Sequence, residues 1–352
     1  MLRIDDQDYM AGLDASGMLR FLADLPEAAQ AAYDRGRAAK LPLTQPAQIL
    51  ICGMGGSAIS GDLIRTQLLE TCAVPVVVHR GDRLPKFAGP TTLAVFMSYS
   101  GNTGETLGCL RDAIQRGVPS VVVTGGGTAG ELAAQHGFPV VAVQPGWQPR
   151  AALGDLFFAL LGVVSQVANC TEPDVPGTVK HLRALRDRFA PGVPAATNPA
   201  KGLALAIQGK TPIIVGATPT TEAVALRWKC QFNENGKQTA LYAVLPEMTH
   251  NDIVNMTATP HHQHVIVAIM DPADSAFVRR QREHALDIIG PHVAEVLEVK
   301  GEGESLLERQ LTAIYLGDFV SVYLGFLNGV DPTPVDAIGV LKGRMANAEA
   351  TS

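Results

Sequence analysis

The chain has 352 residues, enough for about two domains of ordinary size. It carries 28 lysines and arginines against 34 aspartates and glutamates, and this net charge of −6 disfavours a nucleic-acid-binding protein, which needs a basic surface. Apolar residues make up 47% of the chain and charged residues only 18%, so disorder, a coiled coil and a small disulfide scaffold are excluded. The 35 glycines and scarce aromatic residues indicate closely packed, largely parallel sheets under small-residue helices.

The first half alternates short runs rich in valine and isoleucine with amphipathic segments. About 45 residues of predicted helix come first. Five strands are then expected: Gln48–Gly53, Val74–His79, Leu93–Met97, Ser120–Thr124 and Pro139–Val143. Such strand–helix alternation is typical of right-handed βαβ units and predicts a doubly wound parallel sheet.

A segment rich in proline and glycine, Thr171–Pro199, separates this half from the next and is interpreted as an inter-domain connection. Strands are then expected again, at Pro212–Gly216, Thr239–Val244, His264–Met270 and Ala294–Val299, before helices near Leu306–Leu327 and Val335–Met345. The predicted fold class is α/β, with two doubly wound parallel-sheet subdomains and flanking helices. The expected divisions are residues 1–168, 169–200 and 201–352.

The two halves also resemble each other weakly. The segments ILICGMGGSAISGDLIR (49–65) and IIVGATPTTEAVALR (213–227) each follow a strand with a glycine and, four residues later, a hydroxyl side chain. These pairs are Gly53 with Ser57 and Gly216 with Thr220. The pattern favours a duplication.

The cysteines are odd in number and widely spaced: Cys52, Cys72, Cys109, Cys170 and Cys230. No Cys-x-x-Cys occurs, so neither a zinc ribbon nor a redox pair is indicated, and several of them are interpreted as small buried side chains. The N-terminus is acidic and lacks the apolar region of a signal peptide. The most apolar predicted helix, residues 151–164, is interrupted by Asp155 and too short to span a bilayer. We therefore expect a cytoplasmic protein with no membrane or nucleic-acid partner.

Glycines and hydroxyls gather at two predicted strand-to-helix turns, Gly53–Ser57 and Ser98–Thr106 (SYSGNTGET). A helix N-terminus offers unpaired N–H groups and about half a positive charge, so it stabilises an anion without a lysine. Loops of this kind converge at the carboxyl ends of neighbouring strands, where ligands of open sheets bind. A small dianion such as a phosphomonoester fits these turns. The alternative is that Ser57, Ser100 and Thr103 only cap their helices.

Nucleotide and metal motifs fit less well. The first turn lacks the last glycine of a Gly-x-Gly-x-x-Gly fingerprint because Ala58 stands there, and Gly209-Lys210-Thr211 lacks the first glycine of a Walker A motif and precedes a strand. The cluster His261-His262-x-His264 runs into a strand with no paired carboxylate, so no metal site is expected.

A second polar segment, residues 229–252, follows in the other half. A helix from about Thr221 to Asn235-Gly236 places Glu234 in its last turn, where the helix dipole favours a protonated carboxyl group, as suits a general base near neutral pH. A solvated surface glutamate is the alternative. Arg150 opens an apolar helix, a place that the dipole disfavours for a cation, and this indicates a function. His250 lies in a polar loop beyond the next strand.

Ser98–Thr106 resembles the signature of sugar isomerase (SIS) domains. Together with GMGGSAISGD, QFNENGK and a histidine sixteen residues after the glutamate, it resembles the bifunctional phosphoglucose/phosphomannose isomerases, from about residue 46 to about residue 343. The resemblance implies a homodimer that interconverts glucose 6-phosphate, and mannose 6-phosphate, with fructose 6-phosphate through a cis-enediol. It implies no metal and no cofactor. A phosphosugar-binding SIS regulator without activity is the alternative, and it would lack the base.

The same resemblance implies roles for particular residues. Those for the substrate phosphate are Gly55, Gly56, Ser57, Ser98, Ser100 and Thr103. Glu234 would transfer the proton between C2 and C1, and Arg150 would stabilise the charge on the intermediate. His250 of the partner subunit would open the sugar ring, and Lys342 would assist that step.

Overall fold

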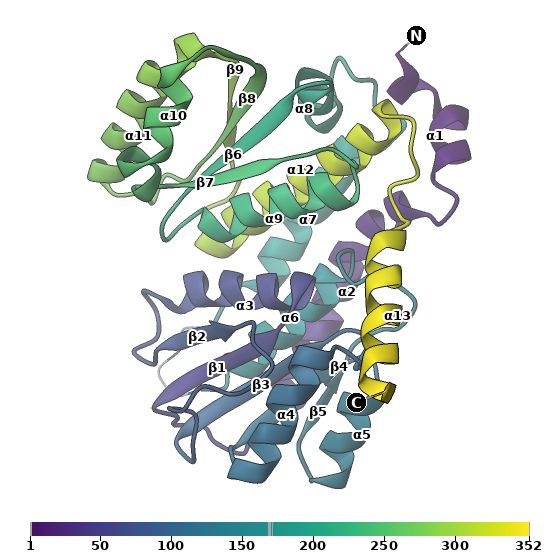
Figure 1. Cartoon of the computed structure of the whole chain (residues 1–352), viewed down its shortest axis with the longest axis vertical. Coiled ribbons are helices and arrows are strands. Elements are labelled where there is room, and N and C mark those ends of the chain that lie inside the picture. Colours follow the sequence, from purple (N-terminus) through teal and green to yellow (C-terminus); the bar gives the residue numbers. More distant parts are fainter. Residues whose placement is uncertain (1, 168–169, 171, 352) are drawn as a thin grey trace.

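The computed structural model describes residues 2–167, 170 and 172–351. It contains two parallel sheets that lie one above the other in Figure 1, with helices between them and on their outer faces. The strand order is β2-β1-β3-β4-β5 in the first sheet and β7-β6-β8-β9 in the second. The four strands of the second sheet follow the same order as β2-β1-β3-β4 of the first, as a duplication predicts. The expected α/β class is confirmed.

The first sheet has short strands whose central members are apolar on both faces, because helices cover both sides. Its strands are β1 (Gln48–Gly53), β2 (Val76–His79), β3 (Thr92–Ser98), β4 (Ser120–Thr124) and β5 (Val140–Ala142). Its helices are α1 (Gln7–Leu13), α2 (Met18–Ala38), α3 (Gly55–Leu68), α4 (Gly104–Arg116), α5 (Gly127–Gln135) and α6 (Leu153–Val164). All five strands expected from the sequence are present.

Helices α2 and α6 pack together at a pair of glycines. A Cβ added to Gly36 would lie 2.1 Å from the carbonyl oxygen of Ala159, and one added to Gly162 would lie 2.2 Å from that of Tyr33. Only glycine permits this backbone approach. All residues of α6 are buried, so the apolar helix seen in the sequence is part of the core on the face of the first sheet to which Ile49 and Ile51 point.

The second half begins with α7 (Val175–Phe189) and α8 (Pro199–Ile207). Its strands are β6 (Thr211–Ala217), β7 (Leu241–Leu245), β8 (His261–Met270) and β9 (Val293–Lys300). Its other helices are α9 (Glu222–Glu234), α10 (Asp252–Ala258), α11 (Ala276–Ile289), α12 (Leu306–Leu327) and α13 (Asp336–Thr351). The four strands expected here are also present.

Helix α12 is the central helix of the second half and packs against α7, α8, α9 and α2. It is long and apolar enough to cross a membrane, but 94% of its most apolar window is buried inside the fold. A buried core helix has the same composition as a membrane span. Its apolar character is therefore explained by packing.

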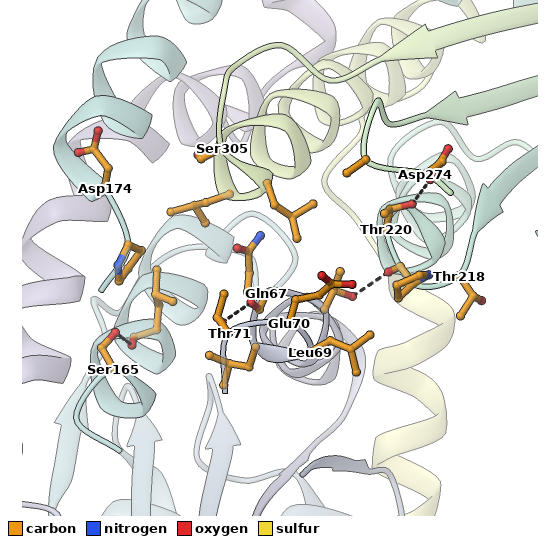
Figure 2. A pocket seen from close by; sticks show the side chains of 18 of the residues that line it. Gln67, Leu69, Glu70, Thr71, Ser165, Asp174, Thr218, Thr220, Asp274 and Ser305 are labelled. Atoms are coloured by element: carbon orange, nitrogen blue, oxygen red, sulfur yellow. Dashed lines mark hydrogen bonds between the residues drawn. The ribbon is translucent and has the colours of Figure 1, made fainter. Parts of the chain in front are cut away.

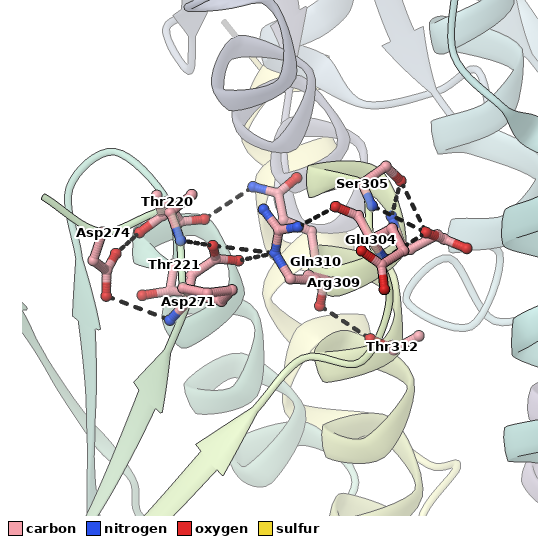
Figure 3. A network of polar contacts seen from close by, with 12 residues as sticks. Thr220, Thr221, Asp271, Asp274, Glu304, Ser305, Arg309, Gln310 and Thr312 are labelled. Carbon is pink, nitrogen blue, oxygen red and sulfur yellow. Dashed lines mark hydrogen bonds and ion pairs between the residues drawn. The ribbon is translucent and has the colours of Figure 1, made fainter.

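Polar contacts fix the start of α12 to the loops after β6 and β8 (Figure 3). Ser305 and Glu308 form a capping box at the N-terminus of the helix. Arg309 Nε donates to Asp271 Oδ2 over 2.9 Å, and Gln310 Nε2 donates to the carbonyl oxygen of Thr220 over 3.0 Å. These bonds hold the carboxyl ends of β6 and β8 in place.

Candidate active site

The two glycine- and hydroxyl-rich turns lie side by side in the structure. Gly53 at the end of β1 pairs with Met97 in β3, so α3 and α4 both begin at the same edge of the sheet. Neither N-cap residue, Met54 of α3 or Thr103 of α4, makes a side-chain capping bond. The N–H of Ser57 donates to the carbonyl oxygen of Met54 over 3.1 Å, which leaves the N–H groups of Gly55 and Gly56, together with those of the first turn of α4, available to an anion.

The hydroxyl side chains of these turns are not used as helix caps. Ser57 lies inside the first turn of α3 and not at its N-cap position. Thr103 stands at the N-cap of α4, but its Oγ1 contacts Ser98 Oγ at 2.9 Å. Ser100 Oγ accepts a hydrogen bond of 3.2 Å from the N–H of Asn102 within the loop. The capping interpretation is therefore not supported at these positions.

Close backbone contacts shape both turns. Gly101 has φ +70°, and a Cβ there would lie 1.7 Å from the carbonyl oxygen of Gly126, so only glycine is accommodated. A Cβ on Gly56 would lie 3.1 Å from the carbonyl oxygen of Pro149. The start of α3 therefore rests against the turn that carries Arg150.

Tyr99 joins the second loop to the same turn. Its hydroxyl donates to the carbonyl oxygen of Gln144 over 2.8 Å and accepts from the N–H of Trp147 over 2.7 Å. The Ser98–Thr106 loop and the segment leading to Arg150 are thus held together. No local pattern indicated this role for Tyr99.

Arg150 links the two halves of the molecule. Its side chain is 5% exposed, and its Nε donates to Asn235 Oδ1 over 2.6 Å. Its Nη2 donates to the carbonyl oxygens of Pro332 and Thr333, each over 2.8 Å. Burial lowers the pKa of Arg150, and the neighbouring carboxylate of Glu234 opposes that shift. A guanidinium remains charged in such a setting.

Glu234 is the last residue of α9, as the sequence predicts. Its Oε2 lies 3.7 Å from Nη1 of Arg150, and its side chain is 33% exposed. Its carbonyl oxygen accepts a hydrogen bond from Lys237 Nζ over 2.5 Å. The carboxylate is therefore held beside a buried cation while it keeps access to solvent or a ligand.

Several residues around Arg150 and Glu234 were not predicted from the sequence. Lys237 has a left-handed backbone, with φ 49°, and its Nζ also donates to the carbonyl oxygen of Pro332 over 2.8 Å. Arg227 donates to the carbonyl oxygen of Arg150 and forms a buried ion pair of 2.7 Å with Asp318. Thr333 Oγ1 is buried with no hydrogen-bond partner in the part of the chain that the structure describes. These contacts involve distant segments, so no local motif indicated them.

His250 and Lys342 do not join this group within one chain. His250 ends a 3₁₀ segment, Glu247–His250, beyond the far end of β7, whose five residues span about 16 Å. Its side chain is exposed. Lys342 is exposed on α13, and its side chain makes no hydrogen bond or ion pair with any described residue. The structure thus unites Arg150, Glu234 and the start of α3, and leaves these two residues apart.

In the described residues of the second half, the turn that corresponds to Gly53–Ser57 is occupied by a carboxylate. Thr220 is the counterpart of Ser57, and its hydroxyl donates to the buried carboxylate of Asp274, as Figure 3 shows. Asp274 in turn pairs with Arg282. A carboxylate thus occupies the position where an anion would otherwise bind Thr220.

A cavity of about 500 Å³ lies between the two subdomains and contains none of the predicted site residues (Figure 2). Its wall includes hydroxyls such as Thr218 and Ser305 and carboxylates such as Glu70 and Asp174. No lysine or arginine is among the described residues that line it. Such a wall suits a phosphate poorly, so we place the candidate active site at Arg150 and Glu234.

Comparisons with known proteins indicate the family of the chain. A family model described as the bacterial phospho-glucose isomerase C-terminal SIS domain matches residues 196–345. A bifunctional phosphoglucose/phosphomannose isomerase from Caldicellulosiruptor bescii is 39% identical over 340 residues, which cover 94% of this chain and 99% of that protein. Another protein of the same name, from Aquifex aeolicus, is 32% identical over 302 residues and covers 85% of this chain and 91% of its own length.

A solved structure also has this fold. The crystal structure of a hypothetical protein from Thermus thermophilus superposes with a TM-score of 0.76 and 15% identity, over 98% of this chain and 94% of that one. That likeness supports the double-sheet fold, whereas the sequence matches extend over nearly the whole length. The chain belongs to the family of bifunctional phosphoglucose/phosphomannose isomerases.

Proposed function

We propose that the protein is an aldose–ketose isomerase that interconverts glucose 6-phosphate and mannose 6-phosphate with fructose 6-phosphate. The observation that carries this proposal is the contact between Arg150 and Glu234 beside the uncapped N-terminus of α3. A base, a cation and an anion-binding turn are the groups that isomerisation of a phosphosugar needs. The relatives' names support the choice of substrates.

Glu234 is the proposed base. Its carboxylate removes the proton from C2 of the open-chain aldose while solvent gives a proton to the carbonyl oxygen at C1, and the product is a cis-enediol. The same carboxyl group returns its proton to C1, the C2 hydroxyl gives its proton to solvent, and the ketose forms. Glu234 ends the cycle as a carboxylate, and because C1 is reduced as C2 is oxidised, no electron acceptor is consumed.

Arg150 is the proposed electrophilic group. Negative charge develops on the substrate oxygens as the proton leaves carbon, and a fixed guanidinium stabilises this charge without having to reorganise. The four contacts that hold Arg150, to Asn235, Pro332, Thr333 and Glu234, fix its orientation before the substrate arrives. Binding of the remote phosphate then positions the reacting carbons.

The proposal includes a homodimer in which His250 of each subunit completes the site of the other and opens the sugar ring. The separation of His250 from Glu234 along β7 favours this arrangement, because an exposed loop can reach a neighbouring subunit. Lys342 assists ring opening from α13. A cytoplasmic location completes the proposal.

The decisive assay supplies fructose 6-phosphate and follows both aldose phosphates with coupled detection. We expect both products, because glucose 6-phosphate and mannose 6-phosphate share one cis-enediol. A non-catalytic regulator would bind fructose 6-phosphate in calorimetry but leave its C1 protons unexchanged in heavy water. That result would replace the isomerase proposal.

The phosphate turn is tested by the double variant Ser100→Ala with Thr103→Ala. Loss of two hydroxyls that bind a charged phosphate is expected to raise KM for fructose 6-phosphate by about 10- to 100-fold and to leave kcat within about threefold. Steady-state kinetics measure both constants. An unchanged KM would show that the phosphate binds elsewhere.

The shared site is tested by mixing subunits. Glu234→Gln and His250→Ala are each expected to be nearly inactive alone. Coexpression of the two chains gives hybrid dimers in which one of the two sites has both native residues, so about a quarter of the wild-type activity is expected for random assembly. If both residues came from the same chain, the mixture would stay as inactive as its parents.

A further inference from the structure

Two of the five cysteines meet although they are far apart in the sequence. Cys72 follows the end of α3, and Cys170 lies in the connection between α6 and α7. Their Sγ atoms are 2.6 Å apart, and 98 residues separate them along the chain. Both residues are half-buried and pack against the main core, whereas Cys52 and Cys109 are fully buried.

The other cysteines differ in surroundings. Cys52 and Cys109 are neighbours but are both buried beneath the first sheet. Cys230 lies on α9 and has no thiol partner among the described residues. Only the pair Cys72–Cys170, within the described part of the chain, therefore combines closeness with exposure to a dissolved oxidant.

We propose that Cys72 and Cys170 are an oxidation site, and that they form an intramolecular disulfide when they meet a small disulfide such as oxidised glutathione. The interpretation of several cysteines as small buried side chains holds for Cys52 and Cys109. The spacing of Cys72 and Cys170 in the sequence gives no sign of their contact, because the fold brings the two residues together.

The reaction is thiol–disulfide exchange and proceeds in two steps. The thiolate of Cys72 attacks one sulfur of oxidised glutathione, and one glutathione thiolate leaves. Cys170 then loses its proton and attacks Sγ of Cys72, and the second glutathione leaves as a thiolate. The two cysteines lose two electrons in total, and the two glutathione molecules gain them.

The order of attack follows from burial. Burial raises the pKa of Cys170 to about 12, and contact with Cys72 adds to the shift. Cys170 is therefore a thiol at neutral pH and serves as the resolving group. The bond would close a loop of 98 residues that contains strands β2 to β5 and the Ser98–Thr106 turn.

The cross-link is expected to stabilise the fold without changing the site. Closing so long a loop restricts the unfolded chain, and a rise in Tm of about 5 °C is expected. The cysteines lie beyond the C-terminus of α3, and its 14 residues place them about 21 Å from the turn at its N-terminus.

The test uses the full-length protein, reduced, freed of reductant and incubated with oxidised glutathione. Digestion without reduction is expected to yield the peptide of Cys72 joined to that of Cys170, and dithiothreitol should reverse both the link and the rise in Tm. Cys170→Ser should abolish both effects. The matched control Cys230→Ser should retain them.

Three results would overturn the proposal. Separate glutathione adducts on Cys72 and Cys170 would show that the thiols do not meet. A link between two chains, or a link between Cys52 and Cys109 in the folded protein, would assign the oxidation to other neighbours. The wild-type peptide map decides the matter even if a variant folds poorly.

Discussion

Glu234→Gln is expected to lower kcat for fructose 6-phosphate by about a thousandfold, because the amide cannot take the proton from carbon. The shape of the side chain is kept, and an amide oxygen can still face Arg150 Nη1, which lies 3.7 Å from the carboxylate. KM is therefore expected to change by less than about threefold. The side chain is one-third exposed, so the free energy of unfolding should stay within about 0.5 kcal/mol of the wild type.

Two measurements separate a lost base from a damaged site. Nuclear magnetic resonance in heavy water follows exchange of the C2 proton of glucose 6-phosphate, which the variant should not catalyse. Glu283→Gln is the matched control, since Glu283 is exposed on α11 and makes no ion pair with any described residue. Full activity in Glu234→Gln would assign the base to another group, and equal loss in Glu283→Gln would indicate a general defect.

The sequence could predict the features that depend on local patterns. All nine expected strands are present because alternating apolar runs and turn residues determine them within a few positions. The pair Asn235-Gly236 predicts a helix end at Glu234, where α9 does end. The sequence also locates the two strand-to-helix turns rich in glycine and hydroxyl side chains, since each lies directly after a strand.

The sequence could not predict contacts made by distant segments. Arg150 stands out in the sequence by its position at a predicted helix start, yet its partners Asn235 and Pro332 are 85 and 182 residues away. The carboxylate that accepts the hydrogen bond of the Thr220 hydroxyl belongs to Asp274, which lies 54 residues further along the chain. The contact between Cys72 and Cys170 could not be predicted either, because 98 residues separate the two cysteines. Each of these features follows from packing of segments that are distant in the chain.

The contacts that fix Arg150 between the two halves lead to the second prediction. Arg150→Ala is expected to lower kcat by at least about a hundredfold, because a fixed donor to the developing charge is removed. KM should rise much less than kcat falls, because that charge appears mainly in the transition state. A loss confined to KM would mean that Arg150 holds the substrate in its ground state.

The structure adds a stability cost that the sequence did not indicate. Without Arg150, two buried oxygen atoms, Oδ1 of Asn235 and the carbonyl oxygen of Thr333, lose their donor, and each costs about 1 kcal/mol or more. The carbonyl oxygen of Pro332 keeps the hydrogen bond from Lys237 Nζ. A fall of about 2 kcal/mol in the free energy of unfolding is therefore expected in urea titrations. Arg183→Ala, which removes an exposed arginine paired with Glu27, should leave the free energy of unfolding almost unchanged, because solvent screens this ion pair.

Added guanidinium ion separates the two effects of Arg150→Ala. At millimolar concentration it can occupy the space left by the side chain, restore the bonds to these oxygens and again present a cation to Glu234. Partial recovery of kcat in the folded variant would show that the charge itself acts in the reaction. If guanidinium restored stability and left kcat at the level of the variant, Arg150 would be a structural link between the halves, and the electrophile would have to be another cation such as Lys237, whose Nζ contacts the same carbonyl oxygen of Pro332.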